Sequence, residues 1–389
     1  MGTKTISIKT GPPVEGTDFY GREKELQYAW EYHISKGVSL LLSAPRRVGK
    51  SSFAKRMLKM AEDNEWKTLY LDLQGIGTEN GLVRLFKEQL KSVKWWNRAG
   101  DVVLKIFDSI KESEIAGNKV IIDSSVWRND TYGKMMQLIE KSGEILIVVD
   151  ELTIFLDHLF KQENGKEKVE FFLEWLRKFR QQSGTKVRWI FCSSVGIENF
   201  ISKHQLSKHF NDVPNFSVGA FSENEAKDFI SRLDVDKRVQ FTEDHIQHIL
   251  DKLVWYLPFF IQILVEKINF LICSEGKHLS NGYIDEAYER LLIENKIYFS
   301  AWDERLTYYD EFKKNARIVL KLCALSNGES RENLLANLSA KTSDIEKTET
   351  DLAQLLDMLK NDGYLAVHNG RYIFRSPLLR DFWMIRYVQ

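Results

Sequence analysis

The sequence lacks an excess of charge of either sign. Lysine and arginine together number 55, aspartate and glutamate also number 55, and the formal net charge is +0. Proteins that bind nucleic acid over a broad surface usually carry a clear positive excess. The composition therefore gives no sign of such a surface, although a local basic patch stays open.

Cysteine and long apolar segments are also scarce. Cys192, Cys273 and Cys323 are far apart and each lies in an apolar segment, which predicts buried, reduced thiols and neither a disulfide framework nor a zinc site. No run approaches the ~18 apolar residues that a membrane span needs. The start, MGTKTISIKT, has no apolar core, and Ile6 stands where a myristoylation signal has serine or threonine. We therefore expect a cytoplasmic protein without a membrane partner.

Length and apolar content are sufficient for more than one domain. The chain has 389 residues, of which 43% are hydrophobic and 12% aromatic, enough for two or three domains. In the first half, short apolar runs alternate with amphipathic segments, an order that predicts an α/β fold with a parallel sheet. The expected strands cover residues 37–43, 67–73, 143–150, 187–194 and 215–218.

The segment after the first expected strand resembles a phosphate-binding loop. The usual pattern is Gly, four variable residues and then Gly-Lys-Ser/Thr. Residues 44–51 are Ala-Pro-Arg-Arg-Val-Gly-Lys-Ser, so Ala44 replaces the first glycine. This replacement strains the backbone little if Ala44 keeps a negative φ, and a strand before and a helix after are the context that such a loop requires. The alternative is a basic turn before a surface helix.

The second half of the loop carries the residue types that nucleotide binding needs. Gly49 lets the backbone approach the phosphates, Lys50 supplies positive charge to the β- and γ-phosphates, and Ser51 supplies an oxygen ligand for Mg²⁺. The predicted nucleotide contacts in the loop are Pro45, Arg46, Arg47, Val48, Gly49, Lys50, Ser51 and Ser52.

Polar side chains end two of the later strands. Asp150 and Glu151 follow an apolar strand, and we predict that Asp150 holds Mg²⁺ while Glu151 polarises the attacking water. Ser193-Ser194 ends the next strand, where a polar residue could hydrogen-bond the γ-phosphate or the water, and of the two we choose Ser194. An Asp-Glu helix cap and a solvated turn serine are the alternatives. The predicted catalytic residues are Lys50, Glu151 and Ser194.

The second half of the chain is predicted to be helical and to end in a small module. Ser222 with Glu225 three residues later predicts a helix start. Residues 222–300 are predicted to be helical throughout and to form a lid over the sheet. Three helices and then a hairpin, with Asn369-Gly370 in its turn, predict a winged helix. The expected elements are helices at 316–326, 332–338 and 344–361 and strands at 364–367 and 372–374.

These motifs together resemble prokaryotic P-loop ATPases of the AAA/STAND type. The resemblance covers most of the chain, least well residues 90–140. It implies a P-loop ATPase core, a helical lid and a winged helix, with ATP and Mg²⁺ as ligands and ATP-driven assembly as the output. It also implies that Gly21, Arg22 and Pro258 lie near the adenine. The segments that carry it are Phe19-Tyr20-Gly21-Arg22-Glu23, the loop, Leu146–Glu151, Cys192–Ile197 and the C-terminal module.

The sequence departs from this family at two places. The lid motif Gly-x-Pro is Tyr256-Leu257-Pro258 here. Many relatives also insert an arginine into a neighbour's site from the region after the serine strand, but no arginine occurs between Phe200 and Ser231. A lysine of that region could replace it, an arginine from elsewhere such as Arg188 could be used, or hydrolysis is slow.

The third helix of the expected winged helix is acidic. A helix that contacts DNA needs arginine, lysine, asparagine or glutamine, so we interpret the module as a protein-contact or self-locking element, and nucleic acid as a partner that is not favoured. Residues 344–362 carry Asp344, Glu346, Glu349, Asp351, Asp357 and Asp362 against Lys347 and Lys360.

The sequence favours a switch ATPase that binds ATP and hydrolyses it slowly. Its nucleotide state would control either self-assembly into a homo-oligomer or the contact with a partner effector protein. One alternative is a DNA-binding ATPase similar to origin initiators or transposition helpers, with Lys91, Lys94 and Arg98 as groove residues. Another is a non-catalytic scaffold. The expected parts are an N-terminal extension (1–18), a P-loop core (19–220) with an insertion (90–140), a helical lid (221–305) and a winged helix (306–389).

Overall fold

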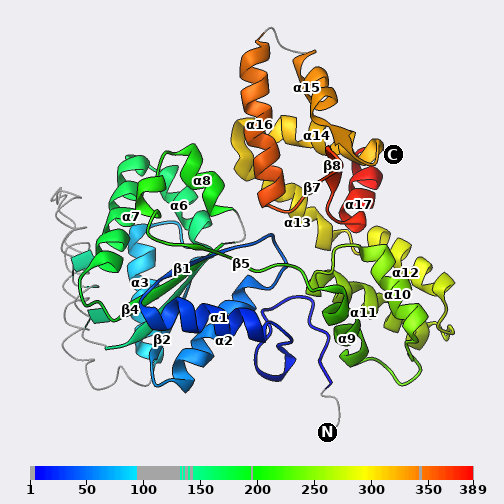
Figure 1. The fold of residues 1–389 in the computed structure, drawn as a ribbon, viewed down its shortest axis with the longest axis horizontal. Helices are drawn as coiled ribbons and strands as arrows, with labels where there is room; N and C mark the ends of the chain where they lie inside the picture. The colour runs from blue at the N-terminus through cyan, green and yellow to red at the C-terminus, as the bar shows by residue number, and fades with distance from the viewer. Residues whose placement is uncertain are drawn as a thin grey trace, which may run out of the picture. The chain divides into compact units, whose positions relative to one another are not determined.

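The chain folds into two compact units. The computed structural model describes residues 5–93, 132–133, 135, 139–140, 143–193, 196–340 and 344–388. One unit, here called the sheet unit, consists of Arg22–Ser43 and Lys50–Ser217. The other, here called the helical unit, consists of Met1–Gly21, Ala44–Gly49 and Val218–Gln389. Figure 1 labels their elements.

The sheet unit contains a five-stranded sheet in the order β2-β3-β4-β1-β5, in which every neighbouring pair is parallel. The predicted α/β fold with a parallel sheet is confirmed, and each expected strand is present within a few residues of its expected bounds. The strands are β1 (Leu40–Ser43), β2 (Lys67–Asp72), β3 (Ile145–Asp150), β4 (Val187–Cys192) and β5 (Asn215–Ser217).

Helices connect these strands, and three of them are not expected from the sequence. The first is α3, which begins after Thr78, whose side chain accepts a hydrogen bond from the backbone N–H of Gly81. The others are α6, which follows β3 almost directly, and the short α8. The helices are α1 (Glu23–Tyr32), α2 (Lys50–Asp63), α3 (Glu79–Ser92), α6 (Leu152–Phe160), α7 (Gly165–Gln181) and α8 (Ile197–Lys203), with short 3-10 turns at Ile34–Lys36 and Ser207–His209.

The two faces of the sheet pack against different helices because strand side chains alternate in direction. Ile145, Ile147 and Val149 of β3 belong to a hydrophobic core that also includes side chains of α3, α6 and α7. Leu146 and Val148 are equally buried but lie outside that core, on the face that α2 covers. A strand with both faces covered is apolar along its length, as β3 is up to its last residue, Asp150.

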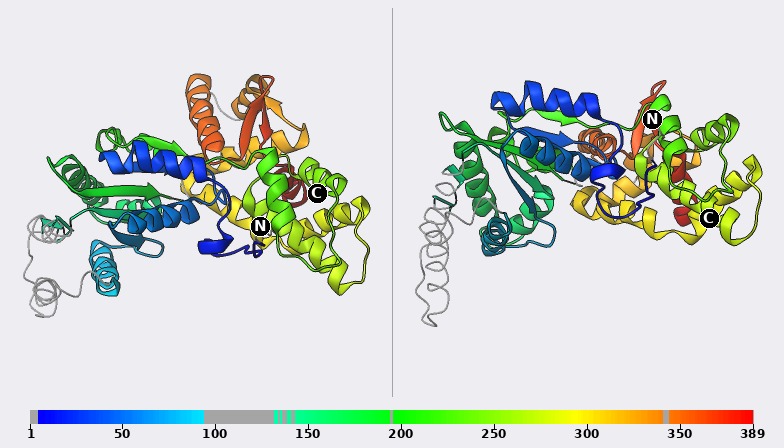
Figure 2. Two further views of the ribbon diagram at one scale, coloured as in Figure 1. Left: turned by 60° about the horizontal axis from the view of Figure 1, so that its bottom comes forward. Right: turned by 90° about the horizontal axis from the view of Figure 1, so that it is seen from below.

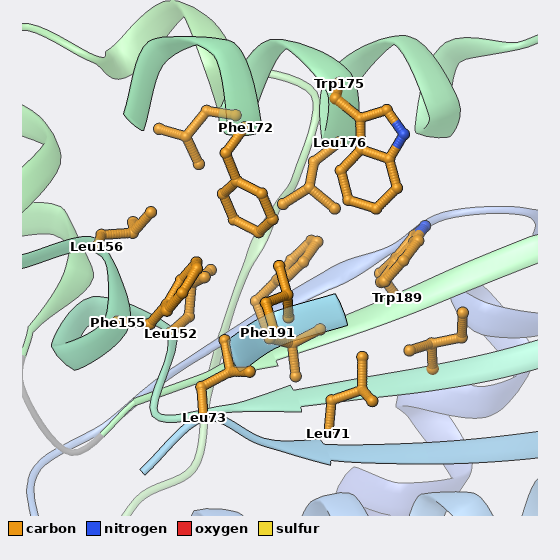
Figure 3. Packing of buried hydrophobic residues seen from close by; sticks show 14 of the residues in the cluster. Leu71, Leu73, Leu152, Phe155, Leu156, Phe172, Trp175, Leu176, Trp189 and Phe191 are labelled. Carbon is orange, nitrogen blue, oxygen red and sulfur yellow. The ribbon is translucent and has the colours of Figure 1, made fainter. Parts of the chain in front are cut away.

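Aromatic rings fill the first of these cores. Figure 3 shows Phe172 and Trp175 of α7 above Phe155 of α6 and Trp189 of β4. The Phe155 and Phe172 rings meet edge to face with their centroids 5.3 Å apart, a geometry that aromatic pairs prefer. This core fixes α6 and α7 on the sheet, and with them the ends of β3 and β4.

Residues 223–305 of the helical unit form five helices, in the region that the sequence predicts to be helical. Ser222 and Glu225 form the predicted capping box before the first of them. The extended N-terminal segment also joins this unit, since the backbone of Ile6 pairs with that of Leu233. The helices are α9 (Glu223–Arg232), α10 (Glu243–Leu253), α11 (Pro258–Ser274), α12 (Asn281–Glu294) and α13 (Ile297–Arg305), and a 3-10 turn at Gly16–Asp18 lies in the N-terminal segment.

The C-terminal part contains the three predicted helices and the predicted hairpin, and their order is confirmed. The winged-helix assignment itself stays a prediction. A short strand, β6, pairs with β8 to give a three-stranded sheet in the order β6-β8-β7. The elements are a 3-10 turn (Leu306–Phe312), α14 (Lys313–Leu325), β6 (Glu329–Ser330), α15 (Arg331–Ser339), α16 (Ile345–Asn361), β7 (Leu365–His368), β8 (Arg371–Phe374) and α17 (Pro377–Tyr387).

Helix α17 ties the C-terminal part to the preceding helices. Figure 2 shows it beside α10 and α12. The Tyr288 hydroxyl of α12 donates a hydrogen bond to the Asp381 carboxylate of α17 at 2.7 Å. The helices of residues 223–305 and the C-terminal part therefore form one unit.

Three other expectations concern cysteines, membranes and the expected insertion. All three cysteines are free thiols, but only Cys192 and Cys323 are buried, and the expectation of burial is wrong for Cys273, which is half-buried. No helix in the part of the chain that the structure describes is long and apolar enough to span a bilayer. Most of residues 90–140, the expected insertion, lies outside the described residues.

We expect Phe155→Ala to lower the free energy of unfolding by about 3–5 kcal/mol, because it leaves a cavity in the fully buried core between α6 and the sheet. Urea unfolding followed by tryptophan fluorescence measures this loss. The control is Tyr32→Ala, at a side chain that is 61% exposed in the same unit, which should change the free energy by less than about 1 kcal/mol. Equal midpoints for both variants would contradict the packing described here.

Candidate phosphate-binding site

The segment Ala44–Gly49 connects β1 directly to α2, so it has the strand–loop–helix context that the sequence predicts. Arg47 and Gly49 adopt positive φ angles of 66° and 98°. Gly49 does so without strain, because it has no Cβ. Ala44 keeps a negative φ, which explains how alanine can stand where the usual pattern has glycine.

The residues at the start of α2 are largely buried. Lys50 is the first residue of the helix and is 7% exposed, and Ser52 is 8% exposed. The first backbone N–H groups of a helix have no partner within it and carry a partial positive charge. A lysine at this position adds a full charge to a site already suited to an anion such as phosphate.

Asp150, the last residue of β3, is held by hydrogen bonds on both carboxylate oxygens. The Tyr70 hydroxyl of β2 donates to Oδ2 at 2.7 Å, and the backbone N–H of Glu151 donates to Oδ1 at 2.9 Å. The side chain is 5% exposed. Burying a carboxylate lowers stability strongly unless donors satisfy it, and these two donors do so.

The strand register places a third group beside this carboxylate. Val148 pairs with Ile190 in the parallel ladder, so the next residues on the same face are Asp150 and Cys192. Burial, the Asp150 charge and a hydrogen bond to Asp150 raise the pKa of the Cys192 thiol well above its usual value, while the Lys50 charge opposes them. Burial and the Asp150 charge likewise raise the pKa of Tyr70. Both groups therefore stay protonated as donors.

Glu151 lies next to this carboxylate in a strained backbone conformation. Its φ of 57° and ψ of 33° place it in the left-handed region before α6, which is unfavourable for residues other than glycine and is found at functional sites. The Ser193 hydroxyl at the end of β4 donates to its carboxylate at 3.4 Å. The sheet unit thus brings Lys50, Asp150, Glu151 and Ser193 to the carboxyl ends of β1, β3 and β4, whereas Ser194 lies outside the described residues.

The arginines of the loop contact later residues of the helical unit, to which the loop itself belongs. The Arg47 guanidinium lies over the Phe259 ring, 4.2 Å from its centroid, and burial lowers its pKa. The Arg46 guanidinium donates to the backbone carbonyl of Ala301 at 3.4 Å. The role of these two side chains as nucleotide ligands stays a prediction.

Pro45 also packs within the helical unit, against the turn after α16. Gly363 has a φ of 84°, and a Cβ added to it would lie 2.6 Å from the Pro45 Cβ and 2.8 Å from the Trp255 ring. Only glycine therefore fits this position without displacing its neighbours. The loop and the C-terminal part touch through this close contact.

The residues predicted to lie near an adenine are found in three places. Gly21, in the helical unit, has a φ of 68° and lies near Phe221. Arg22, in the sheet unit, precedes α1, is 6% exposed and has its guanidinium 3.5 Å from the Glu25 carboxylate. Pro258 is the first residue of α11. Their contact with adenine stays a prediction.

The donors present are suited to Mg²⁺ that is shared with phosphates. Among the residues that the structure describes, no group of three or more His, Cys, Asp or Glu side chains is arranged as a metal site. Mg²⁺ bound with a nucleotide needs only one or two protein oxygens, because phosphates and waters supply the rest. The Ser51 hydroxyl and the Asp150 carboxylate are hard oxygen donors of that kind.

Tyr70 and Cys192 are not among the residues that the sequence predicts for the site, and Ser193 is considered there only together with Ser194. Tyr70 lies in β2, and its contact with Asp150 depends on β2 being the neighbour of β3. The available signal was a hydroxyl-bearing side chain between the two leucines of the strand, Leu69 and Leu71. Ser193 is adjacent to the predicted Ser194, and the sequence alone does not decide which serine faces Glu151.

Comparisons with known proteins identify the fold. No protein-family model matches the chain, and no curated protein matches its sequence. The Walker-type ATPase PABY2304 of Pyrococcus abyssi is similar in structure, with a TM-score of 0.62 and 19% identity over 97% of this chain and 99% of that one. The Aeropyrum pernix ORC2 protein in its ADPNP–ADP complexes has a TM-score of 0.55 and 9% identity over 95% of each chain. The chain therefore has the fold of the P-loop ATPases.

We expect Gly363→Ala to destabilise the protein more than Gly370→Ala. Both glycines have positive φ, at 84° and 75°, but a Cβ at Gly370 meets nothing within 4 Å. Gly370→Ala should therefore lower the free energy of unfolding by only about 1–2 kcal/mol, which is the cost of the left-handed conformation for a residue with a Cβ. Gly363→Ala should lose more and should also speed hydrogen–deuterium exchange in residues 44–49. Equal losses and unchanged exchange would show that the turn and Pro45 are not in contact.

Proposed function

We propose that the protein is an ATP-binding switch ATPase that hydrolyses ATP slowly and whose nucleotide state controls self-assembly or a partner protein. One observation carries the proposal. Within the sheet unit, Lys50 at the start of α2 and the strand-end residues Asp150, Glu151 and Ser193 lie at the carboxyl ends of the parallel strands. A buried lysine at a helix start and carboxylates at a strand end are the groups that bind the phosphates and the Mg²⁺ of a nucleotide.

The side chains have distinct roles in this proposal. Lys50 and the first N–H groups of α2 bind the β- and γ-phosphates. Ser51 and Asp150 hold Mg²⁺, which when bound offsets the negative charge of the phosphates. Glu151 accepts a proton from the attacking water, and Ser193, which hydrogen-bonds Glu151, orients its carboxylate. Ser194 and the loop residues Pro45 to Ser52 keep their predicted contacts, as do Gly21, Arg22 and Pro258 with the adenine.

Slow hydrolysis follows from the charges available. Phosphoryl transfer is accelerated strongly when an arginine stabilises the charge of the transition state. The region from Phe200 to Ser231 contains no arginine. The use of Arg188 in its place stays a prediction; within this chain its guanidinium donates to the backbone carbonyl of Thr185.

The loop contacts support the switch part of the proposal. Pro45, Arg46 and Arg47 touch a glycine turn, a carbonyl and an aromatic ring of the helical unit. A bound phosphate that changes the position of the loop would alter these contacts, and a ligand shifts a conformational equilibrium only through such differential contacts. The proposed parts remain a core of residues 19–220, a lid of 221–305 and a winged helix of 306–389.

We expect the wild-type protein to release phosphate from ATP with Mg²⁺ and Lys50→Ala to bind ATP at least about tenfold more weakly, because a charge-assisted contact is lost. Glu151→Gln should bind ATP normally and hydrolyse it about 100-fold or more slowly. Phosphate release and nucleotide titration measure both effects. The control is Lys59→Ala, at a lysine further along α2 that pairs with Asp63.

Light-scattering mass with ATP and Mg²⁺, measured on the same variants, tests the switch. A higher mass for Glu151→Gln with ATP than without supports nucleotide-controlled self-assembly, and an unchanged mass directs the search to a partner protein. If Glu151→Gln changes neither turnover nor mass while ATP still binds, the protein is the non-catalytic scaffold. If the wild type neither binds nor hydrolyses ATP, the proposal is wrong.

DNA binding is the second candidate, because the sequence predicts a winged helix and some modules with such helices contact DNA. Helix α16 and the residue before it expose Asp344, Glu346, Glu349 and Asp357 against Lys347. Two of these carboxylates form ion pairs, Glu349 with Arg331 and Asp357 with Lys360. Asp362, counted with them from the sequence, is instead buried and accepts a hydrogen bond from Tyr309 at 2.8 Å. An exposed acidic helix repels phosphates.

We therefore expect no ATP-dependent increase in DNA affinity at physiological salt. Fluorescence anisotropy with a labelled duplex, with and without ATP and Mg²⁺ over a range of salt concentrations, measures it. A protein that contacts several phosphates loses affinity steeply as salt rises. Tight, salt-sensitive binding that ATP strengthens would replace the switch proposal by the DNA-binding one.

A further inference from the structure

The contact between Tyr70 and Asp150 has a purpose that packing alone does not explain. Tyr70 lies on the face of β2 that α2 covers, with the Lys55 ammonium 5.3 Å from its ring centroid. Its ring fills space as a phenylalanine ring would. The hydroxyl adds one feature, which is the 2.7 Å hydrogen bond to Asp150 Oδ2.

This hydrogen bond fixes the plane of the carboxylate. Oδ1 accepts the backbone N–H of Glu151 at 2.9 Å, and Oδ2 accepts the Tyr70 hydroxyl. With Tyr70 and the Glu151 N–H on different oxygens, beside the Cys192 thiol as a further donor, the carboxylate cannot rotate about its Cβ–Cγ bond without losing these hydrogen bonds. Each oxygen keeps further lone-pair directions for another ligand.

The lone pairs that remain therefore have defined directions. Mg²⁺ requires a nearly ideal octahedral arrangement of oxygens, so it is sensitive to the orientation of a carboxylate ligand. Hydrogen bonds behind a ligand set that orientation, and their loss typically weakens metal binding about 10- to 100-fold.

We propose that Tyr70 is a positioning residue for Mg²⁺ at Asp150, an inference that rests on the proposed nucleotide site. Tyr70 does not touch the ion or the nucleotide. It acts through Asp150, by holding the carboxylate in the orientation in which the metal meets it. The nucleotide itself is bound by other groups, so its affinity without Mg²⁺ does not depend on Tyr70.

The test measures ATP binding by calorimetry over a range of Mg²⁺ concentrations for the wild type and Tyr70→Phe. The Mg²⁺ concentration at half-maximal tightening should rise at least about tenfold in Tyr70→Phe, while ATP affinity in EDTA stays unchanged. Mn²⁺ binding with ATP, followed by electron paramagnetic resonance, gives a second readout that needs no turnover. The control is Tyr132→Phe, which removes another hydroxyl, bonded to Glu79 at 3.2 Å, in the same unit.

A double-mutant cycle separates positioning from general destabilisation. In an Asp150→Asn background, Tyr70→Phe should cause no further change in the Mg²⁺ midpoint, because the ligand through which it acts is already altered. Equal midpoints for wild type, Tyr70→Phe and Tyr132→Phe would overturn this inference alone. A wild-type protein whose ATP binding does not respond to Mg²⁺ would overturn the proposed nucleotide site and this inference with it.

Discussion

A carboxylate that is nearly buried at the end of a central strand is the constraint on which the site depends. Asp150 is 5% exposed, and a carboxylate in that position needs donors on its oxygens. The neighbouring strands supply them: Tyr70 comes from β2 on one side and Cys192 from β4 on the other. These groups meet only when β2, β3 and β4 are adjacent, parallel and in the observed register. The order of strands and the chemistry of the site are therefore linked.

The sequence predicts the features that depend on local order. Apolar runs predict β1, β3 and β4, because strands covered on both faces need apolar side chains throughout. Lys50, Asp150 and Glu151 are predicted because each stands at a strand end or helix start that is visible in the sequence. Helix α6 is missed for the opposite reason. It is apolar around most of its circumference and directly follows an apolar strand, so that no helical period separates the two.

The features that the sequence does not predict are contacts between distant segments. Tyr70 and Asp150 are 80 residues apart, and Ser193 and Glu151 are 42 apart. No local pattern pairs them, because strand order is decided by packing of the whole sheet. The burial of Asp362 is a similar case. The residue ends an acidic helix and would be counted as surface charge, yet its carboxylate accepts a hydrogen bond from Tyr309 inside the helical unit.

The loop between β1 and α2 has two halves with different tasks, and this division accounts for its unusual sequence. Gly49 and Lys50 carry the features that phosphate binding needs, which are an open backbone and a buried positive charge. Pro45, Arg46 and Arg47 contact the helical unit, where they meet Gly363, Ala301 and Phe259. Ala44 keeps a negative φ, so its position has no need of glycine, and Arg47 adopts its positive φ of 66° as a residue other than glycine. The departure from the usual pattern therefore lies in the half of the loop that contacts the later part of the helical unit, and the Gly49-Lys50-Ser51 half of the pattern is intact.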